Sequence, residues 1–235
     1  RKIMQLLVLT SLAFLMLGCV DMLTSNIFAG LDKPRIPSVD KISTMEEDEL
    51  LSTVESLIES DSFYDDLAEE AAQSADGTSE VKEAILAGLN GIVDGSGAEA
   101  TPEEQQAALL IAAIELNTTA AGDVVDNVIG AATGLIDGSA DTSDTTAIVE
   151  EILGEVFAGI TDQESFDAAL DGLLAAAAAY TFYGESLDDT GEVVVPEGDN
   201  IGAIAQDAVV TLLVAELLAP GSGMTRDDLS DFMLD

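Results

Sequence analysis

Residues 101–104 read Thr-Pro-Glu-Glu and open the stretch QQAALLIAAIEL, which ends at Leu116. Thr101 followed three residues later by Glu104 is a capping box, and Pro102 takes the first helical position, where its missing N–H matters least. A continuous apolar run behind such a start predicts a helix rather than a strand. Capped helices of this kind, separated by loops rich in Gly, Ser and Asp, set the pattern for the remaining chain.

Similar helix starts and stops recur from residue 44 onward. Thr161 and Glu164 predict a second capping box, and the nearly all-apolar stretch 201–218 follows Asn200 and stops before Pro220. We expect an all-α fold, either a single helical bundle or a short array of helical hairpins with about eight or nine helices, in which 201–218 is the central buried helix. The other helices are expected near 44–59, 63–67, 79–95, 101–116, 122–136, 143–158, 161–183 and from 225.

The charge is extreme for a chain with normal apolar content. The 235 residues include 46 Asp and Glu against 7 Lys and Arg, a formal net charge of -39, yet 48% are hydrophobic. Disorder combines high charge with low hydrophobicity, so this composition allows a packed core. Nucleic acid is not an expected partner, because binding phosphates needs Lys and Arg. The absence of His and the single Cys exclude a histidine base, a Cys/His zinc site and an intrachain disulfide.

The N-terminus carries the most specific motif. Arg1 and Lys2 precede an apolar run over 3–17, which is shorter than the roughly 20 residues of a membrane span and typical of a secretory signal sequence. Its end, Met16-Leu17-Gly18-Cys19, resembles the lipobox of bacterial lipoproteins, in which the peptidase cuts before a lipid-modified Cys. The resemblance implies cleavage between Gly18 and Cys19. It also implies a covalent diacylglyceryl and acyl lipid, such as palmitate, on Cys19 as the sole cofactor. An ordinary signal peptide or N-terminal anchor is the alternative.

The lipoprotein resemblance also implies a location in the bacterial cell envelope. Val20, rather than Asp, follows the Cys, which favours the outer over the inner membrane by resemblance to other lipoproteins. The stretch 20–42 contains two prolines and balances three acids with three bases, so it predicts a flexible tether. The expected organisation is a signal peptide over 1–18, a lipidated Cys with its tether over 19–42, and an acidic helical domain over 43–235.

Two groups of side chains are candidate sites, each with a structural alternative. Five aromatic residues could line an apolar ligand pocket or instead anchor the core: Phe63, Tyr64, Tyr180, Phe182 and Tyr183. Three carboxylates, Asp137, Asp141 and Asp144, fall in one loop and are weak candidates for a Ca²⁺ site. The EF-hand order fails because Ile148 occupies the position that needs a Glu, so a solvated loop is favoured and no metal site is expected.

Two further patterns have weak functional readings. Ser79 and Lys82 have the Ser-x-x-Lys spacing of some nucleophilic enzymes, but Ser79 also stands where a helix N-cap is expected. The acidic stretch 185–199 is expected to be the longest loop of the body, and long loops often carry function.

No catalytic set emerges from these patterns, so we do not expect an enzyme. The first hypothesis is a lipid-anchored envelope protein with a scaffold, adaptor or accessory binding role, whose partner is another envelope protein. The second is a solute-binding lipoprotein that passes a small apolar or cationic solute to a transporter. A carboxylate-based hydrolase is a remote third. Beyond these partners, cations are expected to gather near the body by bulk electrostatics.

The acidic body predicts that stability depends on salt. Residues 43–235 hold 43 acids against Lys82 and Arg226, and the resulting like-charge repulsion is screened by added ions. We expect the melting temperature, followed by circular dichroism, to rise markedly between low salt and molar NaCl. A melting temperature that is flat or falls over this range would contradict the prediction.

Overall fold

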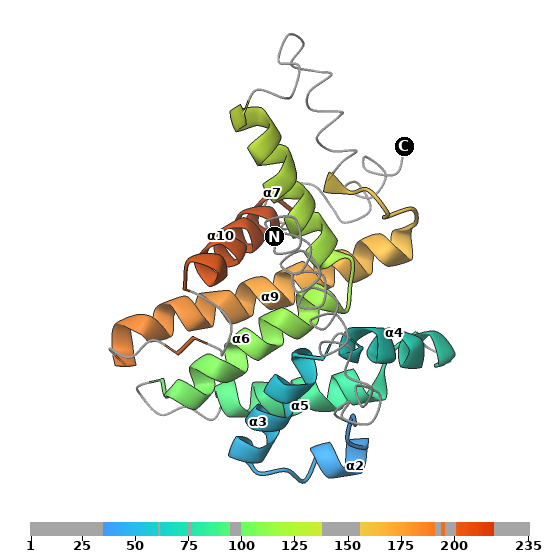
Figure 1. Cartoon of the computed structure of the whole chain (residues 1–235), viewed down its shortest axis with the longest axis vertical. Helices are drawn as coiled ribbons and strands as arrows, with labels where there is room; N and C mark the ends of the chain where they lie inside the picture. Colours follow the sequence, from blue (N-terminus) through green and yellow to red (C-terminus); the bar gives the residue numbers. More distant parts are fainter. Residues whose placement is uncertain are drawn as a thin grey trace, which may run out of the picture. The chain divides into compact units, whose positions relative to one another are not determined.

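The structure is a computed structural model. It describes residues 35–60, 62–74, 77–94, 100–137, 156–190, 194–195 and 201–218, with the backbone alone at 131–137, 188–190 and 217–218. The described helices belong to one compact unit, which begins at Ile36. The helices are α2 (Val39–Ile42), α3 (Glu47–Ile58), α4 (Phe63–Gln73), α5 (Glu80–Asp94), α6 (Pro102–Asn117), α7 (Ala121–Asp137), α9 (Gln163–Thr190) and α10 (Ile201–Leu218) (Figure 1). The predicted all-α fold is confirmed.

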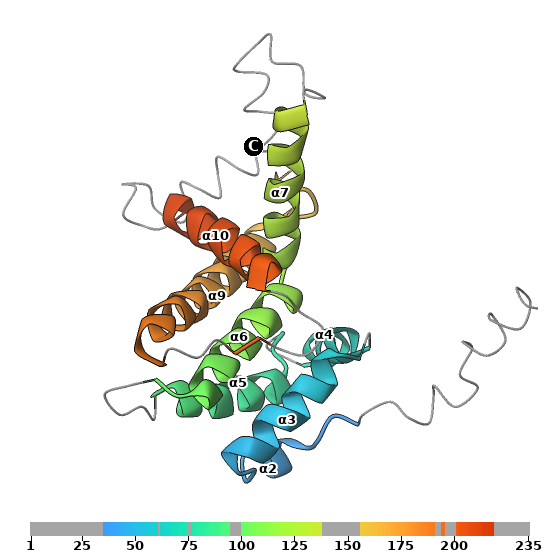
Figure 2. The ribbon, with the colours of Figure 1, turned by 60° about the vertical axis from the view of Figure 1, so that its left-hand side comes forward.

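Helix α6 is the centre of the core. Apolar side chains on all its sides are buried, so it lacks the solvent face that a surface helix would have. It packs mainly against α9 and α5, with α3 and α7 as further neighbours (Figures 1 and 2). At Gly172, α9 approaches the end of α6 so closely that a Cβ atom on residue 172 would collide with the hydroxyl of Thr119, just beyond α6. The missing side chain of Gly172 therefore allows α9 to lie this close to the end of α6.

The prediction that 201–218 is the central buried helix is wrong. Helix α10 forms as predicted, but it packs on α9 and α7 through one side only. Ile204, Val214 and Ala215 are buried on that side, whereas Val209 and Leu213 are exposed. A helix that is apolar all round normally indicates burial, and α6 rather than α10 follows that rule.

The predicted helix caps hold in two places and shift in two others. At α6 the Thr101 N–H donates to Glu104 Oε2 at 2.7 Å and the Glu104 N–H donates to Thr101 Oγ1 at 3.3 Å, which confirms the capping box. Ser79 caps α5, because its hydroxyl accepts from the Lys82 N–H at 3.0 Å. The expected cap Thr44 instead bonds back to the carbonyls of α2, and α3 begins after Glu46.

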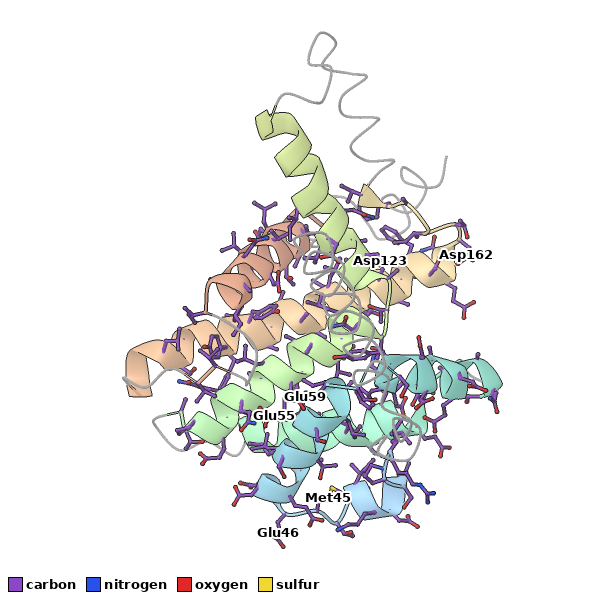
Figure 3. The ribbon with its side chains drawn as sticks, viewed as in Figure 1. Met45, Glu46, Glu55, Glu59, Asp123 and Asp162 are labelled. Atoms are coloured by element: carbon purple, nitrogen blue, oxygen red, sulfur yellow. The ribbon has the colours of Figure 1, made fainter. Side chains whose placement is uncertain are left out.

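The second predicted capping box lies one residue later than expected. Asp162, not Thr161, precedes α9 (Figure 3): its carboxylate accepts from the Ser165 N–H at 2.8 Å, and its own N–H donates to Ser165 Oγ at 3.4 Å. The hydrogen bonds that the Ser165 N–H and hydroxyl donate to this carboxylate lower the pKa of Asp162. Thr and Asp are both good N-caps, so the sequence alone does not choose between neighbours.

Two predicted boundaries are also corrected. The tether expected to reach residue 42 ends earlier, because α2 is helical, Ile42 is buried in the core and Lys41 Nζ pairs with Glu49 Oε1 at 2.6 Å. Proline did not prevent this turn because the helix starts after the proline at 37. Helix α9 continues to Thr190, so the first acids of the predicted 185–199 loop lie on a helix.

Gln105 connects three parts of the core through buried hydrogen bonds. Its side chain is 0% exposed; Nε2 donates to the Ser186 carbonyl at 3.4 Å and Oε1 accepts from the Val194 N–H at 3.1 Å. The amide thus ties α6 to the end of α9 and to the segment that follows it. The hydroxyl of Thr211 on α10, also 0% exposed, has no hydrogen-bond partner among the described residues.

These two buried polar groups predict opposite effects on stability. Gln105→Leu should lower the free energy of unfolding by about 1–3 kcal/mol, because it leaves the Ser186 carbonyl and the Val194 N–H without their partner. Thr211→Val has nearly the same shape and removes an unpaired hydroxyl, so stability should stay equal or rise. Urea denaturation of both variants measures this, and equal losses in the two would contradict the assignment.

Candidate functional site

One side of α10 is an exposed apolar surface, which we call the α10 face. It consists of Ile201, Val209, Leu212 and Leu213, whose exposed fractions are 47%, 63%, 37% and 53%. At 100° per residue these positions fall within an arc of about 120° on the helix surface, and exposed Ala205 lies in the same arc. Grouped large aliphatic side chains on a monomer surface are a mark of an interaction site, whereas scattered ones are not.

The α10 face lies on a strongly acidic body. Helix α10 carries no Lys or Arg, and its exposed Glu216 falls in the same arc as the apolar residues. Among the described residues only two ion pairs form, Lys41–Glu49 and Lys82–Glu115, so the great majority of the carboxylates have no cationic partner there. The apolar stripe therefore belongs to a body in which carboxylates far outnumber bases, and Glu216 is the acid that lies in its arc.

A second feature is a pocket of about 480 Å³ between α4, α5, α6 and α9. Small side chains form much of its wall, and the polar groups at it include Lys82, Glu83, Glu115 and Asp171. Lys82 Nζ donates to Glu115 Oε2 at 2.8 Å, with side chains only 20% and 15% exposed. The volume lies within the range of small-molecule sites, which run from roughly 300 to 1,000 Å³.

The Ser79–Lys82 spacing does not form a nucleophile pair in this pocket. The Ser79 hydroxyl accepts from the Lys82 backbone N–H and itself donates to the Glu70 carboxylate. The Lys82 ammonium lies instead on Glu115. Ser79 is therefore placed as a helix cap, the structural alternative given for it above.

The five aromatic candidates divide between two helices. Phe63 and Tyr64 lie on α4 with ring centroids 5.2 Å apart, and Phe63 is buried in the core. On α9, Tyr180 and Tyr183 are buried and Phe182 is partly buried. The Tyr183 hydroxyl donates to the Val194 carbonyl at 2.8 Å, and burial raises the Tyr183 pKa.

Only one of these aromatic residues lines the pocket nearest to α10. Tyr180 borders a cavity of about 220 Å³ together with Ile204 and Asp207 of α10, and the other four aromatic candidates are not part of that lining. The structure therefore does not gather the α4 pair and the three α9 aromatics around this cavity. Phe63, Tyr180 and Tyr183 belong to the hydrophobic core, and Tyr64 and Phe182 are partly buried against it.

Most of the remaining predicted site residues lie outside the part of the chain that the structure describes. Gly18, Cys19, Asp141 and Asp144 lie outside the described residues, and Asp137 is the last residue of α7. Within the described ranges no group of three or more carboxylate or Cys side chains is placed to hold a metal ion.

Two observations on the described residues bear on the other hypotheses. A hydrolase would need two converging buried carboxylates, and in the described part of the chain Glu104 is the one buried acid, used in its helix cap. No single described helix is long and apolar enough to cross a membrane. The pair Pro102–Asn117 and Ala121–Gly130, bent by 86°, qualifies by length and composition only, and its first helix is the buried α6.

The α10 face is the feature that sequence reasoning missed. Composition indicated an apolar helix correctly, but it gave no sign of which side would stay uncovered, because Gln206, Asp207 and Glu216 do not gather on a single polar face.

Removing one member of the Lys82–Glu115 ion pair is expected to lower stability more than removing both. Lys82→Met should lower the free energy of unfolding by about 1–3 kcal/mol, because it leaves a largely buried carboxylate unpaired. The double variant Lys82→Met/Glu115→Leu should lie within about 1 kcal/mol of the parent, since both charges are then gone. Chemical denaturation in a double-mutant cycle measures the coupling, and additive effects would contradict it.

Comparisons with protein-family models, with curated proteins and with solved structures found no match to this chain. The α10 face and the α4–α5–α6–α9 pocket are therefore the two features from which a function is inferred. The first is an exposed apolar surface, and the second is a recess already bridged by an ion pair.

Proposed function

We propose that this protein is a non-enzymatic adaptor or scaffold of the bacterial cell envelope, anchored by a lipid on Cys19, that binds another envelope protein through the α10 face. The observation that carries the proposal is the α10 face itself. Large aliphatic side chains stay in water there, although each would gain roughly 1.5–3 kcal/mol on full burial. A partner that covers them supplies this stabilisation.

The other side of α10 makes the face a suitable platform. Ile204, Val214 and Ala215 are buried, and the helix packs along α9, which in turn packs on the central α6. The exposed residues are therefore held on an element whose position is fixed by the core. Such an element loses little conformational freedom on binding, which favours affinity.

The second candidate function is binding of a small cationic solute in the pocket near Lys82. The observation that favours it is the excess of carboxylates at the recess, with Glu83, Glu115 and Asp171 against one ammonium. It ranks second because Glu115 is already paired with Lys82. A solute there would have to bind the remaining carboxylates or break the ion pair.

Site-specific crosslinking in the native envelope tests the adaptor proposal. A photoreactive residue at Val209, the most exposed large apolar position of α10, should yield a covalent adduct with one defined protein. The matched control places the same residue at Val195, an exposed valine outside any helix, where no such adduct is expected. Mass spectrometry of the adducts identifies the partner. Absence of an adduct at Val209, together with a cationic molecule that co-purifies, would favour the solute-binding function instead.

A further inference from the structure

We propose that the partner segment bound by the α10 face is a basic amphipathic helix, with aliphatic side chains on one side and Lys or Arg flanking them. This inference rests on the proposed adaptor function and specifies the chemistry of its partner. Three observations lead to it: the length and width of the apolar stripe, the acidic charge of the body together with Glu216 on α10, and the absence of any base on this helix.

The stripe has the dimensions of a helix–helix contact. From Ile201 to Leu213 it covers twelve residue steps, about 18 Å at 1.5 Å per residue, or somewhat more than three turns. Its arc of about 120° matches the apolar width by which a helix packs on one neighbour. A partner helix of roughly twelve to fourteen residues, with aliphatic side chains at i, i+3, i+4 and i+7, would cover this stripe.

The surrounding charge determines which helix fits. Beyond residue 42 the chain holds 43 acids against two bases, and Glu216 lies in the arc of the apolar stripe, near the carboxyl end of the helix. The carboxyl end of α10 adds the negative partial charge of the helix dipole. Lys and Arg on the flanks of a partner would meet this negative potential. Acidic flanks would add repulsion at the same place.

A second copy of this chain is a poor occupant for the same reason. Each copy carries a formal charge of -39, so pairing two α10 faces would bring two acidic bodies together. Such an association would strengthen as salt screens the repulsion. Binding of a basic helix would weaken with salt, so the sign of the salt dependence separates the two occupants.

A lipid surface fits α10 poorly as well. Helices that lie in a membrane interface carry Lys or Arg on their polar side, which attracts anionic headgroups. Helix α10 has Gln206, Asp207 and Glu216 as its strongly polar residues and no base. Its charge would oppose contact with anionic lipid.

A synthetic peptide tests this inference directly. The probe is a fluorescent 14-residue helix built from Leu and Lys, with Leu on one side, and it is titrated against the full chain held in phosphatidylcholine vesicles. We expect saturable binding, read by fluorescence anisotropy, that weakens at least tenfold between 50 and 500 mM NaCl, as order-of-magnitude values for a contact with several charge pairs.

Matched variants show whether the peptide uses the α10 face. The double variant Val209→Gln/Leu213→Gln changes two exposed side chains and should weaken binding at least tenfold with little effect on folding. Val195→Gln, which changes an exposed valine outside α10, should leave binding unchanged. Peptides with Glu in place of Lys, or with the same Leu and Lys in scrambled order, should bind far more weakly to the parent.

Four outcomes would overturn the inference. Equal binding by the parent and the α10 double variant would mean that the peptide responds only to bulk charge. Absence of binding would mean that the face is covered by another part of this chain or requires a different partner. Tighter self-association with rising salt, lost in the double variant, would identify a second copy as the occupant. A Val209 crosslink to a defined protein without binding of the Leu/Lys peptide would retain the adaptor function and reject only the basic partner.

Discussion

The fold depends on keeping one helix, α6, out of water on nearly all sides. Its apolar residues point in every direction, so helices must surround it, and α9 and α5 lie closest. Gln105 shows how strict this constraint is, because even its amide is fully buried and finds its partners on α9 and on the segment after it. Close approach at Gly172 lets α9 serve as the second long support of the core.

Charge acts against this core rather than for it. Two ion pairs, Lys41–Glu49 and Lys82–Glu115, are formed in the described part of the chain, where acids far outnumber bases. The helix starts offset part of the repulsion, because carboxylates such as Glu104 and Asp162 accept backbone N–H bonds and lie at the positive end of a helix. Aliphatic packing must supply the remaining stability, since aromatic residues make up only 4% of the chain.

Helix starts and helix positions could be predicted from adjacent residues in the sequence. Which helix would be buried could not. The capping box at Thr101 and the Ser79 cap follow from a few adjacent residues, and the helix at 201–218 follows from its apolar content. The cap at Asp162 shifted because two good capping residues stand side by side. Which helix would be central could not be derived, because neither α6 nor α10 gathers its polar residues on one face and α10 is the more apolar of the two. Helix α6 is central because more helices pack on it. The α10 face was missed for that reason.

The two apolar helices α6 and α10 differ in how much of their surface other helices cover. Helix α6 has neighbours on all sides, so its apolar residues serve folding alone. Helix α9 packs on α6, and α10 packs on the outside of α9. The buried residues of α10 face α9 and α7. Val209, Leu212 and Leu213 are not part of the described core. On an acidic surface, where a polar residue at these positions would be better solvated, their presence is most simply explained by a partner that covers them.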